Sequence, residues 1–245
     1  KQGHERRNRG RVQSVGPWVA QSILNGGNVS SIGFGSSGQM GNGGNSSSTI
    51  LVTAQTAVGS LAGIVEIAAG GSTIFARSNT NLVYAWGLNA QGNLCGATGP
   101  ANQAQQITAL GNTTTQLAVA SSQVAFFKQN DGTVKACGVN TSGQLGTNSL
   151  TPTSTSTPVT VTGLTSVDAI SAGQGVIGAL RTDGLVLAWG GGTTNISSAN
   201  VGDGTTATRL KPTPVLAING AGGLDTNDWY LDLRPSVATT VPGAS

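Results

Sequence analysis

The sequence is poor in the side chains that most enzymes use for catalysis. Only 9% of its 245 residues are charged, and His4 is the only histidine. A Ser-His-Asp triad or a histidine-based metal site is therefore not expected. Asp131 and Asp183 each precede a glycine, a context typical of tight turns rather than of catalytic carboxylates. We predict that the chain is not an enzyme, with no catalytic or metal-binding residue, no cofactor and no small-molecule substrate.

Long hydrophobic runs are missing as well. No stretch approaches the 18 or more apolar residues of a transmembrane helix, and we expect no membrane insertion. Aromatic residues make up only 4% of the chain, so the core is expected to consist mainly of Val, Leu, Ile and Ala. Two cysteines, Cys95 and Cys137, are too few for a disulfide framework, and the sequence leaves their pairing open.

Glycine is abundant, with 38 residues, and Ser, Thr and Asn fill much of the remainder. Such residues populate turns, so the composition indicates many short strands joined by tight turns. The segment 136–146, Ala-Cys-Gly-Val-Asn-Thr-Ser-Gly-Gln-Leu-Gly, recurs with variations at 85–94 and 32–41, and 188–191 begins it once more. This recurrence identifies a repeat near 50 residues, with anchor glycines spaced 54, 51 and 52 residues apart: Gly33, Gly87, Gly138 and Gly190.

Three of the repeats contain a hairpin signal shortly before the anchor glycine. Asp131-Gly132 and Asp183-Gly184 hold this position in the last two repeats, and Gly26-Gly27 holds it in the first. Asp-Gly and Gly-Gly between apolar runs favour a tight turn between two strands. Two further extended segments follow in each repeat. Four repeats of four strands predict an all-β fold, a β-propeller of four-stranded blades that is either a small closed ring or an open arc.

The pattern divides the chain into three parts. Residues 1–15 are expected to be a basic flexible arm, residues 16–236 hold the repeats, and residues 237–245 are a flexible tail. The repeats are expected at about 16–68, 69–119, 120–171 and 172–235. Near the end, Asp232-Leu233-Arg234 fits the start of a fifth repeat. The other interpretation is a donated or closing strand that completes the sheet begun by Val19–Leu24, formed by Trp229, Tyr230, Leu231, Asp232 and Leu233.

The repeat motif resembles the RCC1 (regulator of chromosome condensation) repeat. The fourth repeat carries it as Leu180, Asp183, Gly184, Val186, Trp189 and Gly190, and the third as Cys137 to Gly146 followed by Pro158-Val159. The resemblance spans about residues 17–233. Ile32 and Gly35 depart from the motif in the first repeat, and the fourth loses the second half of it.

This resemblance implies a propeller, usually of seven blades. Four repeats then imply a smaller ring, an arc completed by another chain, or further blades outside the sequence. Family members act as guanine-nucleotide exchange factors, chromatin binders, photoreceptors, enzyme inhibitors and surface or phage modules. The fold alone does not choose between these roles.

The repeat also defines residues expected to have structural roles. The Trp side chains are expected to pack between strands or blades, with an interface role as the alternative. Gly33 to Gly38 matches a dinucleotide-binding fingerprint, but no helix pattern follows it, so nucleotide binding is not expected. The repeat-defining residues are Gly33, Gly38, Trp86, Gly87, Asn89, Gly92, Asp131, Gly132, Gly138, Asn140, Gly143, Asp183, Gly184, Trp189 and Gly190.

Positive charge is concentrated at the N-terminus. The formal net charge is +3, and without the first eleven residues the chain is close to neutral. Nucleic acid or another polyanion is expected to contact the arm alone, through Lys1, Arg6, Arg7, Arg9 and Arg11. A merely solvated terminus is the alternative.

We interpret the chain as a non-enzymatic RCC1-like propeller that acts as a structural or adhesive building block through protein–protein contacts. Few charges and plentiful Ser, Thr, Asn and Gly favour an extracellular or virion-surface location, with a nuclear location as the alternative. The expected partner is another protein or copies of the chain itself. One alternative function is a chromatin or small-GTPase regulator with a DNA-contacting arm. Another is a protein inhibitor that binds its target by one propeller face.

Overall fold

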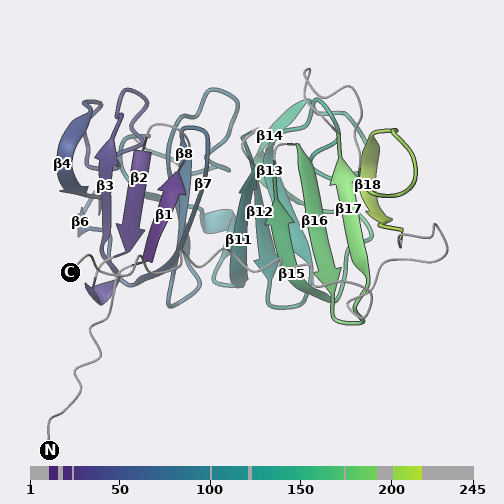
Figure 1. Ribbon diagram of the computed structural model, residues 1–245. Helices are drawn as coiled ribbons and strands as arrows, with labels where there is room; N and C mark the ends of the chain where they lie inside the picture. The colour runs from purple at the N-terminus through teal and green to yellow at the C-terminus, as the bar shows by residue number, and fades with distance from the viewer. Residues whose placement is uncertain are drawn as a thin grey trace, which may run out of the picture.

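The computed structural model describes residues 11–15, 19–23, 25–99, 101–120, 123–173, 175–191 and 201–216. These residues form four four-stranded antiparallel sheets, one short hairpin and two single 3-10 turns. The sheets stand side by side in chain order, like successive blades of a propeller (Figure 1). The predicted all-β architecture of propeller-like blades is therefore confirmed.

Each sheet is built from strands that follow one another along the chain. The first contains β1 (Arg11–Val15), β2 (Val19–Ile23), β3 (Val29–Gly33) and β4 (Ser48–Thr53), with η1 (Asn25–Gly27) between β2 and β3. The hairpin β5 (Gln55–Thr56) and β6 (Gly59–Ser60) follows it. The second contains β7 (Ile64–Gly70), β8 (Thr73–Ser78), β9 (Val83–Gly87) and β10 (Gln105–Gln106), followed by η2 (Thr108–Leu110). The third contains β11 (Thr114–Ala120), β12 (Val124–Gln129), β13 (Val134–Val139) and β14 (Ser154–Thr160). The fourth contains β15 (Val167–Ala172), β16 (Val176–Arg181), β17 (Val186–Gly190) and β18 (Arg209–Pro214).

The sheets are offset by one strand from the repeats read in the sequence. The segments at 64–68, 116–119 and 167–170, assigned to the end of a repeat, pair with the strand that follows them. A tight turn such as Gly71-Ser72 makes this pairing local. Residues 11–15, placed in the basic arm, form β1 and pair with β2. β1 thus occupies the place beside β2 that was expected for the segment 229–233, which lies outside the described residues.

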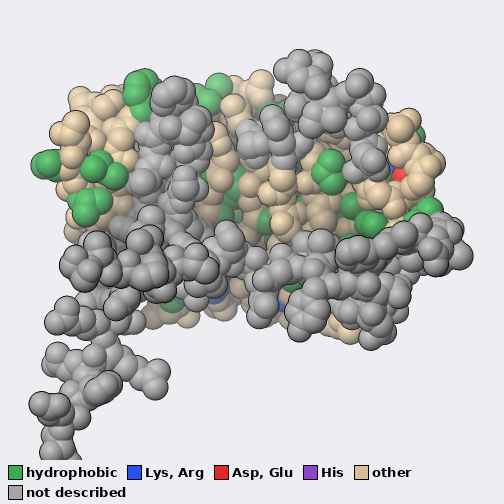
Figure 2. All heavy atoms as spheres, in the orientation of Figure 1, with side chains coloured by type: hydrophobic (Ala, Val, Ile, Leu, Met, Phe, Trp, Pro, Cys, Tyr) green, Lys and Arg blue, Asp and Glu red, His purple; other side chains and the backbone are tan. Residues whose placement is uncertain are grey.

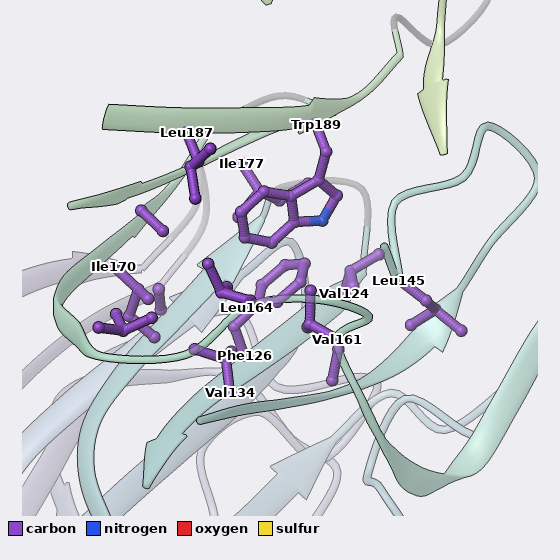
Figure 3. Packing of buried hydrophobic residues seen from close by; sticks show 14 of the residues in the cluster. Val124, Phe126, Val134, Leu145, Val161, Leu164, Ile170, Ile177, Leu187 and Trp189 are labelled. Atoms are coloured by element: carbon purple, nitrogen blue, oxygen red, sulfur yellow. The ribbon is translucent and has the colours of Figure 1, made fainter. Parts of the chain in front are cut away.

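Apolar cores lie between successive sheets. β7 packs on β1 and β2, β11 packs on β7 and β8, and β15 packs on β11 and β12. The central strand β12 is buried at nearly every position, because a stacked blade has a neighbour on both faces. Between the third and fourth sheets, Phe126 meets Trp189 edge to face with ring centroids 5.9 Å apart (Figure 3). Burial of these side chains supplies the main stabilising free energy.

One contact recurs at the boundaries between sheets. The indole Nε1–H of Trp86, on the second sheet, donates to the Gln39 carbonyl oxygen of the first sheet at 3.0 Å. Trp189, on the fourth sheet, donates in the same way to the Gln144 carbonyl oxygen of the third at 2.9 Å. Gly41 and Gly146 lie against these indoles, where a Cβ atom would collide with the ring. We call this arrangement the Trp–Gly junction.

The boundary between the second and third sheets replaces this contact with a covalent bond. Cys137 stands at the Trp position of the third sheet and Cys95 at the glycine position of the second sheet. The two form a buried disulfide with Cα atoms 5.6 Å apart. The pairing left open by the sequence is settled, and we call this boundary the disulfide junction.

Candidate binding surface at the repeat loops

In the first three sheets, a loop follows the anchor glycine at the same end of the sheet. The anchor requires glycine because its φ is positive, 106° at Gly138, and a Cβ atom there would collide with the Gln123 carbonyl oxygen. Asn140 then closes the loop: its Oδ1 accepts from the Leu145 N–H at 3.1 Å, and its Nδ2 donates to the Ser149 carbonyl oxygen at 2.9 Å. Asn89 accepts from the Leu94 N–H at 3.1 Å in the second repeat. The loops are thus held by side chains of the repeat motif.

A depression of about 420 Å³ opens between the loops of the first and second sheets. The loop after β3 supplies one wall, and the loop after β9 supplies the opposite wall. Asn102 spans the two, since its Nδ2 donates to the Gly43 carbonyl oxygen at 2.8 Å. The lining consists of Ser36, Ser37, Asn45, Gly87, Leu88, Asn89, Ala101 and Asn102.

The chemistry of this depression is neutral and polar. Its serine hydroxyls and asparagine amides donate and accept hydrogen bonds, the side chains of Leu88 and Ala101 are apolar, and none of these groups titrates near neutral pH. Within the described residues, no group of three or more His, Cys, Asp or Glu side chains could hold a metal ion. The arrangement is suited to holding a polar surface of another molecule.

The two Asp-Gly turns lie in hairpins and hold local backbone. Asp131 Oδ1 accepts from Thr133 Oγ1 at 2.7 Å and from the Thr133 N–H at 2.9 Å. The hydroxyl of Thr133 is the main cause of a lowered pKa for Asp131. Asp183 accepts from the Leu185 N–H at 3.3 Å and pairs with Arg181 at 2.6 Å. Gly132 and Gly184 follow with positive φ, as such turns require.

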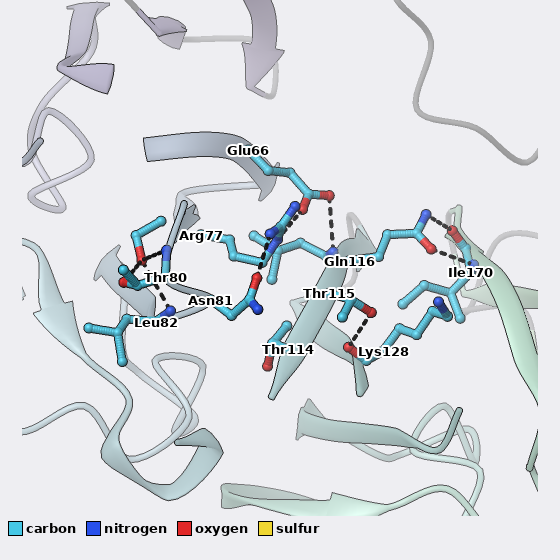
Figure 4. Close-up of polar contacts among 12 residues, drawn as sticks. Glu66, Arg77, Thr80, Asn81, Leu82, Thr114, Thr115, Gln116, Lys128 and Ile170 are labelled. Carbon is cyan, nitrogen blue, oxygen red and sulfur yellow. Dashed lines mark hydrogen bonds and ion pairs between the residues drawn. The ribbon is translucent and has the colours of Figure 1, made fainter. Parts of the chain in front are cut away.

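Side chains on the inner strands join neighbouring sheets (Figure 4). Glu66, on β7, accepts from the Leu117 N–H of β11 at 3.0 Å and pairs with Arg77 at 2.7 Å. Gln116, at the equivalent position of β11, donates to the Ile170 carbonyl oxygen and accepts from the Ile170 N–H, both at 3.0 Å. These links were not found from the sequence. Asp168 is the second residue of β15, one position earlier than Glu66 in β7, and it is exposed.

The remaining residues singled out from the sequence fall into two groups. Gly38, Gly92 and Gly143 have positive φ, and each lies against the next sheet. Gly38 contacts Asn102, in the loop before the outer strand of the second sheet. Gly92 and Gly143 contact the outer strands of the third and fourth sheets, at Ser156 and Leu210. The second group lies outside the described residues: Lys1, Arg6, Arg7, Arg9, Trp229, Tyr230, Leu231, Asp232 and Leu233. Arg11 is the first residue of β1.

The broken motif of the fourth repeat keeps part of its geometry. The Leu216 N–H donates to the Gly202 carbonyl oxygen at 2.8 Å, as the Thr162 N–H does to that of Gly146 at 3.0 Å in the third repeat. Asp203 follows, with Arg209 and Thr205 donating to its carboxylate. These hydrogen bonds outweigh the effect of burial, which by itself would raise the pKa of Asp203, and the net result is a lowered pKa.

Comparison with known proteins agrees with this geometry. Two family models, both described as the regulator of chromosome condensation (RCC1) repeat, match residues 131–180 and 64–93. No curated protein matches the chain with significance. In the described part of the chain, no helix has the length and apolar character needed to cross a membrane.

Solved structures share the fold at low sequence identity. Human WBSCR16 is 20% identical with a TM-score of 0.70, over 84% of this chain and 53% of that protein. Prp20p from Saccharomyces cerevisiae, described with its binding to Gsp1p and histones, is 17% identical with a TM-score of 0.68, over 82% and 49%. Yeast RCC1 (Prp20) in complex with Kap60 is 18% identical with a TM-score of 0.68, over 85% and 49%. The chain spans about half the length of these proteins.

The expected extracellular or virion-surface location is wrong. The RCC1-like neighbour Prp20p is described with binding to Gsp1p and histones, which is at odds with a location on a cell or virion surface. The error arose because the abundance of Gly, Ser, Thr and Asn is a property of the turns of this fold and does not report on location. The chain contains RCC1-type repeats and has the fold of an RCC1-like propeller.

Proposed function

We propose that the chain is a protein-binding propeller of the RCC1 kind, acting by contact rather than by catalysis. Its partner docks on the loop surface and inserts a polar segment into the depression between the first two sheets. The observation that carries this proposal is the depression itself, which is lined by neutral hydrogen-bonding groups. Loops on a rigid sheet scaffold are also the usual place for binding residues.

The choice of partner class rests on the structural neighbours. Prp20p is described with binding to Gsp1p and histones, and yeast RCC1 (Prp20) is bound to Kap60. We therefore propose a regulatory protein partner, with a small GTPase or a histone as the first candidates. A building block made of copies of the chain remains the second possibility for the partner.

Binding to purified Gsp1p and to histones by biolayer interferometry tests this function. Ser36→Arg together with Asn45→Arg places two long side chains in the depression, and we expect at least a tenfold loss of affinity. Both positions are exposed, so folding should be preserved. Thr141→Arg is the matched control, because Thr141 occupies the position of Ser36 in the third repeat but lies outside the depression.

Three outcomes decide the proposal. Binding that is lost in the double variant and kept in the control supports the loop surface. Equal binding by all variants would place the partner elsewhere on the molecule. No binding to either protein would reject the proposed partner class.

The basic arm supports a secondary nucleic-acid contact. Four cations precede Arg11, and phosphate contacts of this kind weaken steeply with salt. The test is DNA binding at two salt concentrations after removal of residues 1–9, a boundary that leaves β1 intact. Unchanged binding after this deletion would exclude the arm as the contact.

A further inference from the structure

Asn89 lines the depression between the first and second sheets and uses only one end of its side-chain amide. Its Oδ1 accepts from the Leu94 N–H at 3.1 Å, and because a backbone N–H can only donate, this contact fixes which end is the oxygen. Asn140, at the same motif position of the third sheet, also donates from Nδ2, to the carbonyl oxygens of Ser149 and Pro152 at 2.9 and 3.1 Å. The Nδ2 of Asn89 makes no such hydrogen bond within the described part of the chain, so its N–H groups are left for a ligand.

Asn102 supplies the complementary group in the same lining. Its Nδ2 donates to the Gly43 carbonyl oxygen at 2.8 Å, and because a carbonyl oxygen can only accept, the remaining end of this amide is Oδ1. Oδ1 accepts no hydrogen bond from the residues that the structure describes. The depression therefore combines an unused donor on Asn89 with an unused acceptor on Asn102.

The chain segments that form the depression carry no charge. No Asp, Glu, Lys, Arg or His occurs in residues 12–65 or 78–127, and these two ranges contain the whole lining. Figure 2 shows tan and green atoms, without the colours of charged side chains, over the described part of the first sheet where Figure 1 labels β3 and β4. A carboxylate or ammonium group bound in the depression would lose hydration without gaining an opposite charge from the lining. A neutral ligand is therefore favoured.

A primary carboxamide fits this combination of groups. It is uncharged, its oxygen can accept from Asn89 Nδ2, and its N–H groups can donate to Asn102 Oδ1. The apolar side chains of Leu88 and Ala101 suit the methylene groups that carry the amide of a glutamine. A sugar also carries donors and acceptors, but the lining has no aromatic side chain on which a sugar ring could stack.

We infer that the depression recognises the side-chain carboxamide of a glutamine presented by the protein partner. The amide oxygen accepts from Asn89, and the amide N–H groups donate to Asn102. This inference rests on the proposed function, because it names the group that the partner inserts. It adds a selectivity to that function: glutamine is accepted, and glutamate, which has nearly the same shape, is rejected because its carboxylate is charged.

NMR titration of the isotope-labelled chain with short capped peptides tests this selectivity. The probes are Ac-Gly-Gln-Gly-NHMe, Ac-Gly-Glu-Gly-NHMe and Ac-Gly-Gly-Gly-NHMe, and the signals followed are the backbone and side-chain amides of Asn89 and Asn102. We expect saturable shifts with the glutamine peptide and a dissociation constant on the order of 1 mM. The glutamate and glycine peptides should bind about tenfold more weakly, the first because of its charge and the second because it lacks the carboxamide.

Asn89→Asp is the decisive variant. It keeps an oxygen for the Leu94 N–H, so the loop is preserved, but it replaces the unused donor with a second acceptor. We expect it to weaken glutamine-peptide binding about tenfold. Gln91→Glu is the matched control, because it adds the same charge to the same loop at an exposed position outside the lining. Ser36→Arg with Asn45→Arg blocks the depression from the first sheet and provides an independent variant.

The outcomes separate this inference from the proposed function. Equal binding of all three peptides, or binding that survives Asn89→Asp and the blocking variant, would overturn the carboxamide site. The absence of saturable shifts up to about 50 mM peptide would do the same. If Gsp1p or histones bind at the depression while the peptides show no selectivity, the proposed function stands and this inference alone fails. Selective glutamine binding without binding to either protein would support the site and reject the partner class.

Discussion

The disulfide junction and the Trp–Gly junction between the third and fourth sheets occupy the same place in the repeat. In one, Cys137 is bonded to Cys95; in the other, Trp189 lies over Gly146. Cys95 keeps the left-handed backbone of the glycine that it replaces, with φ of 57° against 69° at Gly146. The comparison shows that the packing of the sheets constrains the backbone at this position. Either a disulfide or a tryptophan packed on a glycine can then join the two sheets there.

The two junctions also differ in how completely their polar groups are paired. At the disulfide junction, Asn93 Nδ2 donates to Gln123 Oε1 at 2.6 Å. At the third–fourth junction, Gly175 stands in the place of Gln123, and Gln144 Nε2 is buried with no hydrogen-bond partner among the described residues. The third–fourth junction therefore depends more heavily on apolar packing, whereas at the first–second junction Gln39 Nε2 donates to Ser72 Oγ at 3.2 Å.

Removal of Trp189 should have the largest effect. Trp189→Ala deletes a fully buried indole and its contact with Phe126, and we expect the free energy of unfolding to fall by about 3–5 kcal/mol. Urea denaturation measures this change. Trp189→Phe is the control, because it keeps much of the apolar volume but leaves the Gln144 carbonyl oxygen without its donor. A loss below about 1 kcal/mol for the alanine variant would contradict the packing role.

Removal of the disulfide should have the next largest effect. The bond links residues 42 positions apart, and its loss in Cys95→Ala with Cys137→Ala should lower the free energy of unfolding by about 2–4 kcal/mol. Denaturation with and without a reducing agent gives the same comparison for the unmodified chain. Cys95→Gly with Cys137→Trp rebuilds a Trp–Gly junction and should recover part of the loss. An equal stability of reduced and oxidised chains would show that the bond contributes nothing.

The inner-strand link should have a smaller effect at the third–fourth boundary. Gln116→Ala removes two hydrogen bonds to Ile170, and we expect a loss of about 1–3 kcal/mol. Amide hydrogen exchange should also become faster at Ile170. Asp168→Ala, which changes an exposed residue on the same strand as Ile170, is the matched control. Unchanged exchange at Ile170 would show that Gln116 does not hold the two strands together.

The loop of the fourth sheet should respond to pH more than the loop of the third. Asp203 has a lowered pKa, so its contribution to stability is present above the unfolded pKa and is lost as the pH falls through the folded value. The amide of Asn140 does not titrate. Exchange rates of the 201–209 amides between pH 5 and pH 2.5 test this small effect, with Asp203→Asn as the control. Equal pH dependence of the variant and the unmodified chain would contradict it.

Much of the fold could be read from the sequence because the repeat encodes it locally. Asp131-Gly132 makes a turn by itself, and Gly138 makes a bend that few other residues allow. Which strand begins each sheet could not be predicted in this way. The strand at 64–70 is adjacent in sequence to both neighbouring repeats, and only the pairing through the Gly71-Ser72 turn assigns it to the second sheet.

The candidate site was harder to predict for a related reason. Ser36 and Asn45 look like ordinary loop residues, and they line a depression only because the loop after β9 stands opposite. Glu66 and Gln116 lie on matching strands, but their partners are backbone groups of the next sheet, which no sequence pattern reports. The disulfide did have a signal in the sequence. Cys95 occupies the position of Gly41 and Gly146, which lies opposite the Trp position of the following repeat.

By itself, the sequence determined the repeat, the turns and the all-β propeller-like architecture, because turn chemistry and strand periodicity act over a few neighbouring residues. Tertiary structure alone decided which strands share a sheet, that Cys95 meets Cys137, and which loops form the depression. Each of these depends on contacts between residues tens of positions apart, where stacking of one sheet on the next fixes the distance.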